Sequence, residues 1–153
     1  MKKNAPDDLR IAVARAAGQR DLLDELAALY VRLDRQIEGP NEPCDRCGRC
    51  CDFAAFGHRL YVTPIELALL AQDPPPPCPS HGAQQCPYQI NGQCAAHGQR
   101  ALGCRVFFCR SPADRQQALY EPYHAELGAL HERSGVPYLY AELTQALARI
   151  GCR

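Results

Sequence analysis

The sequence predicts a mainly α-helical, small irregular domain stapled by metal, in which amphipathic helices flank a cysteine-rich centre of loops with at most short β-hairpin pieces. Three observations predict this fold class. Apolar residues recur with a helical period near both ends, cysteine, glycine and proline replace that period in the middle, and nine of the ten cysteines lie between Cys44 and Cys109. The 153 residues fit a single domain, 1–153. We divide it into an N-terminal helix (1–40), a cysteine-cluster metal-binding core (41–110) and C-terminal helices (111–153).

Composition and charge restrict the class of protein. Lys+Arg and Asp+Glu both number 17, which gives no electrostatic reason to expect a nucleic-acid or membrane partner. The N-terminus MKKNAPDDLR lacks the apolar stretch of a secretory signal, so we expect a cytoplasmic protein. In a reducing compartment clustered cysteines are ligands or redox groups more often than disulfides. The alternative is a disulfide-stapled secreted domain, which the even cysteine count permits and the spacing disfavours.

The first segment predicts one long amphipathic helix. Asp7 or Asp8 can cap its start, and Gly39-Pro40 ends it. Its apolar face consists of residues three or four apart: Leu22, Leu26, Leu29, Tyr30, Leu33 and Ile37. We expect this face to pack against the rest of the domain, with binding to a partner protein as the alternative.

A short helix is predicted inside the centre. Thr63-Pro64-Ile65-Glu66 has the pattern of a capping box with proline at the first helical position. Leu67, Leu70 and Ala71 would form its apolar side. Asp73 and the run 74–77, four prolines, would end it and form an extended spacer, or a ligand for a proline-reading module.

The first cysteine cluster is Cys44-Asp-Arg-Cys47-Gly-Arg-Cys50-Cys51. Two residues between cysteines allow both sulfurs to reach one ion, and this spacing occurs in zinc and iron–sulfur sites alike. Adjacent side chains diverge, so Cys50 and Cys51 either serve two centres or act as one ligand and one neighbour. A vicinal disulfide is the third alternative.

The second cluster contains Cys86 and Cys94, followed by Cys104 and Cys109. Asn91-Gly92 predicts a tight turn that would bring Cys86 and Cys94 close together. His97 has ligand spacing from Cys94, and it is either a zinc ligand or a hydrogen-bonding neighbour. The remaining residues of these types are expected to be peripheral or ordinary polar residues: Cys78, Cys152, His58, His81, His124 and His131.

Thiolates around a metal leave a negative site that nearby cations can offset. Between residues 44 and 110 there are six arginines and four acidic residues, so the formal charge before thiolates is +2. These arginines either pair with the sulfurs or are solvated. The same stretch has few large apolar residues, so metal binding there would supply folding free energy directly.

Two helices are predicted in the last third. Pro122 suits the first turn of one that carries Tyr123, Leu127 and Leu130 and ends near Gly135. The other would start at Pro137 and end at Gly151, with four residues on one face: Leu139, Leu143, Leu147 and Ile150.

The order of motifs resembles the YkgJ-like cysteine-cluster family, whose domains are described as zinc- or iron-chelating. The resemblance covers residues 41–110: the CxxCxxCC run at 44–51, the Thr-Pro-x-Glu helix start, Cys86-Pro, and Cys94 before Cys104-Arg-x-Phe. It implies that the metal ligands are Cys44, Cys47, Cys50, Cys51, Cys86, Cys94, Cys104 and Cys109. The chain departs from the family in having Arg100-Ala101 instead of Arg-Pro, and His97 where tyrosine is frequent.

The sequence therefore favours a metal-binding protein with an iron–sulfur cluster of the 4Fe-4S kind, in an electron-transfer or redox-sensing role. The alternative is a zinc-stabilised structural or interaction domain without catalytic activity. We identify no nucleophile–base pair, carboxylate pair or second cofactor motif in the sequence, which leaves open whether the protein is an enzyme.

Overall fold

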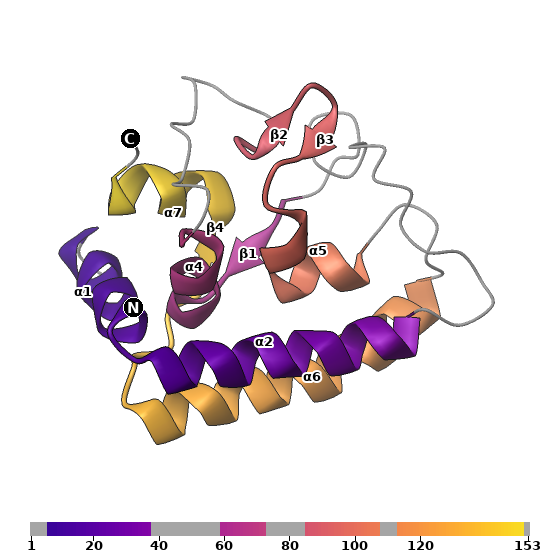
Figure 1. The fold of residues 1–153 in the computed structure, drawn as a ribbon, viewed down its shortest axis with the longest axis horizontal. Coiled ribbons are helices and arrows are strands. Elements are labelled where there is room, and N and C mark those ends of the chain that lie inside the picture. Colours follow the sequence, from indigo (N-terminus) through magenta and orange to yellow (C-terminus); the bar gives the residue numbers. More distant parts are fainter. Residues whose placement is uncertain (1–5, 38–58, 73–84, 108–112, 152–153) are drawn as a thin grey trace.

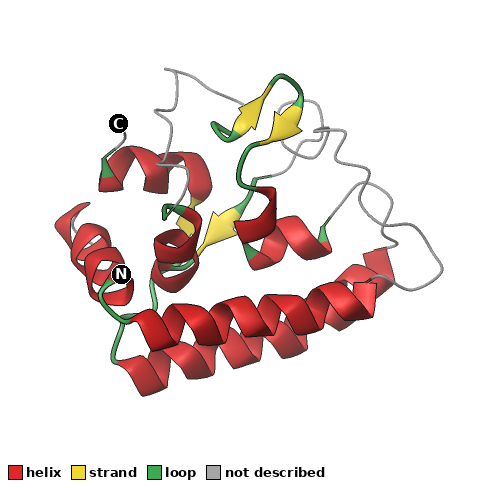
Figure 2. Cartoon of the chain, in the orientation of Figure 1, coloured by secondary structure: helices red, strands yellow, loops and turns green. Residues whose placement is uncertain are grey.

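The structure is a computed structural model that describes residues 6–37, 59–72, 85–107 and 113–151. Its helices are α1 Pro6–Ala17, α2 Arg20–Ile37, α4 Pro64–Leu70, the 3-10 helix η2 His97–Gln99, α5 Leu102–Val106, α6 Ala113–Ser134 and α7 Leu143–Ile150. Its strands are β1 Tyr61–Val62, β2 Gln89–Ile90, β3 Gln93–Cys94 and β4 Ala141–Glu142. The mainly helical prediction is confirmed, and the strands are only short pieces (Figure 2).

The N-terminal segment forms two helices where the sequence predicts one. The amide of Gly18 still donates to the carbonyl of Ala14 at 3.1 Å, after which the chain leaves the helix before α2 begins. Glycine is a poor helix former, so the break falls there. The prediction that Asp7 or Asp8 caps the start is also wrong, because α1 begins at Pro6 and both acids lie inside its first turn.

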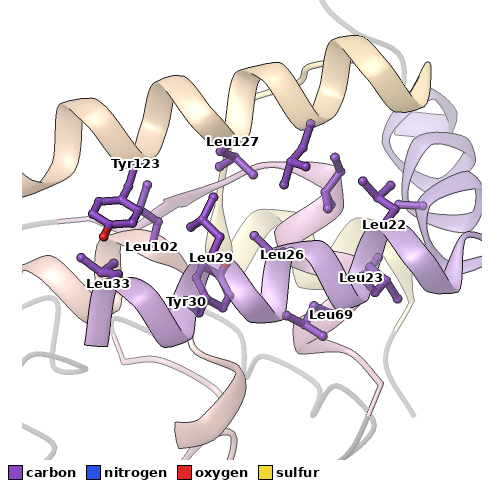
Figure 3. Close-up of a cluster of buried hydrophobic side chains, with 14 of the residues drawn as sticks. Leu22, Leu23, Leu26, Leu29, Tyr30, Leu33, Leu69, Leu102, Tyr123 and Leu127 are labelled. Atoms are coloured by element: carbon purple, nitrogen blue, oxygen red, sulfur yellow. The ribbon is translucent and has the colours of Figure 1, made fainter. Parts of the chain in front are cut away.

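The two longest helices, α2 and α6, lie side by side and antiparallel (Figure 1). Two exposed ion pairs tie them, Arg32 to Glu126 at 2.6 Å and Arg133 to Glu25 at 3.1 Å. Between them and helices α1, α4 and α5 lies a buried apolar cluster, which we call the α2–α6 cluster (Figure 3). It includes all six residues of the predicted apolar face: Leu22, Leu26, Leu29, Tyr30, Leu33 and Ile37.

Helix α4 lies between this cluster and a second one. The predicted capping box is present at its start, but the helix is buried on every side rather than on one. Ile65 and Leu69 belong to the α2–α6 cluster, whereas Leu67 and Leu70 belong to the second cluster. The second cluster also takes residues from α1, α7, β1 and the β2–β3 hairpin, and we call it the hairpin cluster.

The centre of the chain contributes more core than its composition suggests. Buried side chains from the described part of 41–110 include Leu60, Val62, Ile65, Leu67, Leu69, Leu70, Tyr88, Leu102 and Val106. Much of the folding free energy of these segments therefore comes from apolar burial. The expectation that metal supplies it applies most directly to the cysteine-rich segments outside the described residues.

Both C-terminal helices begin elsewhere than predicted. Helix α6 starts at Ala113, so Pro122 lies inside it. The carbonyl that loses its partner belongs to Ala118, and both residues are on the exposed side, where water can bond to that carbonyl. The helix ends before Gly135 (φ 72°) as predicted.

The last helix, α7, begins at Leu143 rather than at Pro137. The intervening residues are extended, and β4 pairs antiparallel with β1, with Tyr61 opposite Glu142. Glu142 fixes the helix start, because its carboxylate accepts hydrogen bonds from the amides of Thr144 and Gln145. Gly151 ends the helix with φ 87°, as predicted.

Within the described residues, no helix has the length and apolar character needed to cross a bilayer. Three predicted features lie outside the described residues: the proline run 74–77, the Gly39-Pro40 stop and both peripheral cysteines, Cys78 and Cys152.

Candidate metal centre

The structure describes three of the eight predicted ligands, Cys86, Cys94 and Cys104. The other five lie outside the described residues: Cys44, Cys47, Cys50, Cys51 and Cys109. All three described cysteines pack on the hairpin cluster. Cys86 is 7% exposed, and Cys94 and Cys104 are partly buried. Cysteines up to 18 positions apart in the sequence thus contact the same apolar cluster.

The predicted turn at Asn91-Gly92 is confirmed. Both residues have positive φ, 53° and 76°, as a two-residue type I′ hairpin requires. Strand β2 pairs with β3 so that Gln89 lies opposite Cys94. Upstream, the amide of Gln89 donates to the carbonyl of Cys86 at 3.0 Å, which folds Cys86 back over the start of the hairpin.

Tyr88 lies between Cys86 and the strand and links the hairpin to α4. Its ring is 1% exposed, and its hydroxyl donates to the carbonyl of Leu70 at 3.4 Å. Burial raises the pKa of Tyr88, and the sulfurs of Cys86 and Cys94 raise it further. Tyr88 therefore stays protonated and provides an apolar wall beside two of the candidate ligands.

Cys104 is carried by α5, and a buried carboxylate holds the start of that helix. Glu66 of α4 is 2% exposed, and its Oε1 accepts from the amide of Leu102 at 2.8 Å. The same oxygen accepts from the hydroxyl of Tyr30 at 3.3 Å, and Oε2 accepts from the amide of Thr63 at 2.9 Å. Glu66 therefore joins α2, α4 and α5.

Burial and hydrogen bonding shift the pKa of Glu66 in opposite directions. Burial raises the pKa of the carboxyl group, whereas the donors from Leu102 and Thr63 lower it, and burial is the larger effect. Burial and the neighbouring Glu66 also raise the pKa of Tyr30. The group is thus a structural hydrogen-bond acceptor rather than an exposed acid.

Arg105 holds the other end of α5. It is 4% exposed and donates to Asp34 Oδ2 at 2.6 Å, to the carbonyl of Gly98 at 2.6 Å and to the carbonyl of Arg100 at 2.8 Å. Its guanidinium carbon also lies 4.2 Å from the centre of the Tyr30 ring. The sequence suggests that these arginines either pair with sulfurs or are solvated. Arg105 does neither, because it is buried and its donors bond to Asp34 and two carbonyls.

The other described arginines differ from Arg105. Arg100 donates to the carbonyls of His97 at 3.0 Å and of Cys104 at 3.4 Å, so it braces the backbone around the candidate ligand. Arg59 is exposed. The remaining three of the six, Arg46, Arg49 and Arg110, lie outside the described residues.

Gly103 allows α5 to lie close to Leu60. A Cβ at this glycine would stand 2.6 Å from Leu60 Cδ1, closer than packed carbon atoms approach. Any larger residue would displace Leu60 or push Cys104 away from the hairpin cluster. The glycine before Cys104 is thus part of what positions the sulfur.

His97 begins the 3-10 helix η2, and its carbonyl accepts from Arg100. No group of three or more histidine, cysteine, aspartate or glutamate side chains among the described residues is arranged to hold a metal ion. Cys86, Cys94 and Cys104 are therefore not gathered as a three-ligand group in the part of the chain that the structure describes.

The sequence analysis does not predict that three polar residues are buried: Glu66, Arg105 and His131. Glu66 occupies a short helix that is otherwise apolar, Pro64–Leu70, and this was the available signal for its burial. Arg105 likewise lies in a short helix whose other buried residues are apolar, among them Leu102 and Val106. His131 was expected to be an ordinary polar residue, but it is 3% exposed.

Comparisons of the chain with protein-family models, curated proteins and solved structures find no match. The resemblance to the YkgJ-like family therefore rests on the order of motifs between residues 41 and 110 alone.

Proposed function

We propose that this protein binds metal through its cysteine cluster, as an iron–sulfur protein with an electron-transfer or redox-sensing role. The observation that carries the proposal is the common location of Cys86, Cys94 and Cys104 against the hairpin cluster. Together with the CxxCxxCC run at 44–51, these cysteines supply enough thiolates for a cluster.

The surroundings of the three cysteines support a bound metal. A thiolate in an apolar environment is costly unless a cation neutralises it, and a metal ion does so at the sulfur itself. Cys86 is nearly fully buried beside Tyr88 and the apolar residues of the hairpin cluster. Iron–sulfur potentials depend on burial and on hydrogen bonds to sulfur, so this environment would also tune a redox role.

A zinc-stabilised structural domain is the second candidate, and the contacts of Arg105 favour it. Arg105 bonds to Asp34 and two carbonyls, so its guanidinium does not supply the hydrogen bonds to sulfur that would tune a redox potential. Structural zinc sites are closed and frequently all-cysteine, and they need no redox tuning.

The test is purification without oxygen, followed by visible spectroscopy and elemental analysis. An iron–sulfur protein is brown, contains iron and sulfide, and bleaches in air, whereas a zinc protein is colourless with stoichiometric zinc. Bleaching by dithionite that is reversed by a mild oxidant supports the redox role.

Single cysteine variants test the ligands. Cys47→Ser and Cys104→Ser should each lose metal, while Cys152→Ser, outside the predicted ligand set, should keep it. Full metal content in both ligand variants, with unchanged protease resistance, refutes the assignment. Absence of any metal from the anaerobically purified protein refutes metal binding itself.

A further inference from the structure

Helix α5, which carries Cys104, is too short to hold its own position. It has five residues, and so short a segment is not stable as an isolated helix in water. Its place in the fold therefore depends on its contacts with other elements. Because Cys104 is a candidate ligand, the same contacts determine where a candidate metal ligand lies.

The side chains of α5 pack on both parts of the core. Leu102 and Val106 are four positions apart, hence on one face of the helix, and both belong to the α2–α6 cluster. Cys104 packs against the hairpin cluster instead. A rotation of α5 would disturb both contacts at once, so the packing limits rotation. Apolar packing is not directional, however, and does not by itself fix where the helix starts.

A directional contact from Glu66 fixes the start of α5. The amide of Leu102, the first residue of the helix, donates to Glu66 Oε1 at 2.8 Å. The other oxygen of Glu66 accepts from the amide of Thr63 at 2.9 Å, which ties the same side chain to the start of α4. Because Glu66 is 2% exposed, water does not readily take over either bond. The position of α4 thus sets that of the first turn of α5.

Both oxygens of Glu66 are used, and this matters for what can replace the residue. A glutamine has one acceptor oxygen and an NH₂ group that only donates. It can therefore accept well from only one of the two backbone amides, that of Leu102 or that of Thr63. The hydroxyl of Tyr30 is a third donor to Glu66, but it does not belong to α5. Its loss would leave the bond to Leu102 in place.

From these contacts we propose that Glu66 is a positioning residue for the metal site and acts through Cys104. The inference rests on the proposed function, because Cys104 must be a ligand. Residues that hold a metal ligand in place commonly change metal affinity 10–100-fold when they are replaced. A Glu66 that served only the stability of the fold would leave the affinity of the folded protein for metal unchanged.

The test is a titration of the reduced, metal-free, full-length protein with Co²⁺ in the absence of oxygen. Cobalt bound by thiolates absorbs in the near ultraviolet, and the absorbance per bound ion increases with the number of thiolates that bind it. We expect Glu66→Ala to bind Co²⁺ about 10–100-fold more weakly than the parent, with a lower absorbance per bound ion at saturation. Glu66→Gln should show an intermediate loss of affinity, and it decides the test if Glu66→Ala does not fold.

Two control variants separate positioning from stability. Leu22→Ala leaves a cavity at the end of the α2–α6 cluster that lies away from Leu102, so it destabilises the protein without removing a contact to α5 (Figure 3). Tyr30→Phe removes only the hydroxyl donor to Glu66. We expect both controls to bind Co²⁺ as the parent does.

Two results overturn the inference: an equal loss of affinity in Glu66→Ala and Leu22→Ala, or parent-like affinity and absorbance in the Glu66 variants that fold. A parent protein that shows no thiolate–cobalt absorption is a different result. It refutes the proposed function itself, and the inference falls with it.

Discussion

Glu66→Ala should destabilise the protein more than any exposed acidic substitution, because three donors converge on this one buried carboxylate. The variant leaves the amides of Thr63 and Leu102 and the hydroxyl of Tyr30 without their acceptor. Since Glu66 is 2% exposed, water does not readily replace it. Each buried donor left unpaired costs about 1–3 kcal/mol, and removing the burial penalty of the carboxyl group offsets part of the total. We expect a net loss of about 3–5 kcal/mol in the free energy of unfolding.

Urea unfolding followed by far-UV circular dichroism, with linear extrapolation to water, measures this loss. Glu121→Ala, an exposed change on α6, is the control and should stay within about 0.5 kcal/mol of the parent protein. Glu66→Gln keeps one acceptor oxygen and should lose about 1–3 kcal/mol. If Glu66→Ala unfolds within about 1 kcal/mol of the parent, then Glu66 does not hold α5 in place.

The same residue predicts a pH dependence. Because burial raises the pKa of Glu66 in the folded state, the folded protein holds this proton more tightly than the unfolded chain does. The stabilisation is fully present below the ordinary value of 4.5 and is lost as pH rises through the folded-state pKa. The free energy of unfolding of the parent minus that of Glu66→Gln should therefore fall as pH increases above 4.5. A difference that rises instead would mean that the amide donors outweigh burial.

Three other outcomes follow from the structure. Arg105→Ala removes a buried guanidinium that pairs at 2.6 Å with the partly exposed Asp34 and bonds to two carbonyls, and it should cost about 2–4 kcal/mol in denaturant unfolding. The exposed Arg133→Ala should stay within about 1 kcal/mol of the parent. Gly92→Ala should cost about 1–2 kcal/mol because φ is 76°, whereas Gly98→Ala, with open space and no positive φ, should be nearly neutral; thermal unfolding compares the two. Under the proposed function, a chelator that removes the metal under reducing conditions should lower hydrogen-exchange protection in the β2–β3 hairpin and leave α2 protected; equal loss in both would mean that the metal stabilises the whole fold.

Sequence periodicity predicted the elements whose signals are local. The apolar face from Leu22 to Ile37, the capping box at Thr63 and the turn at Asn91-Gly92 each depend on a few neighbouring residues, and all three are confirmed. The turn is the clearest case, since a two-residue hairpin requires positive φ at both positions and these residue types tolerate it.

The errors arise where tertiary contacts override local signals. Gly18 interrupts a helical pattern that continues on both sides, and the break becomes favourable because α1 then packs on α4 and α7. Pro137 was predicted to open a helix, but pairing with β1 extends the chain as far as Glu142. A capping box alone also does not reveal that Glu66 is buried, since its second hydrogen bond goes to Leu102, 36 residues away.

The division of the core into two clusters determines how a metal and the fold would be coupled. The three described cysteines contact the hairpin cluster, whereas no described cysteine belongs to the α2–α6 cluster. Helix α4 contributes to both, and Glu66 joins it to α5, which carries Cys104. Under the proposed function, gain or loss of metal would thus act first on the hairpin half, while α2 and α6 keep their packing. A metal centre placed this way can alter one part of the protein without unfolding the rest, which is what a redox-sensing role requires.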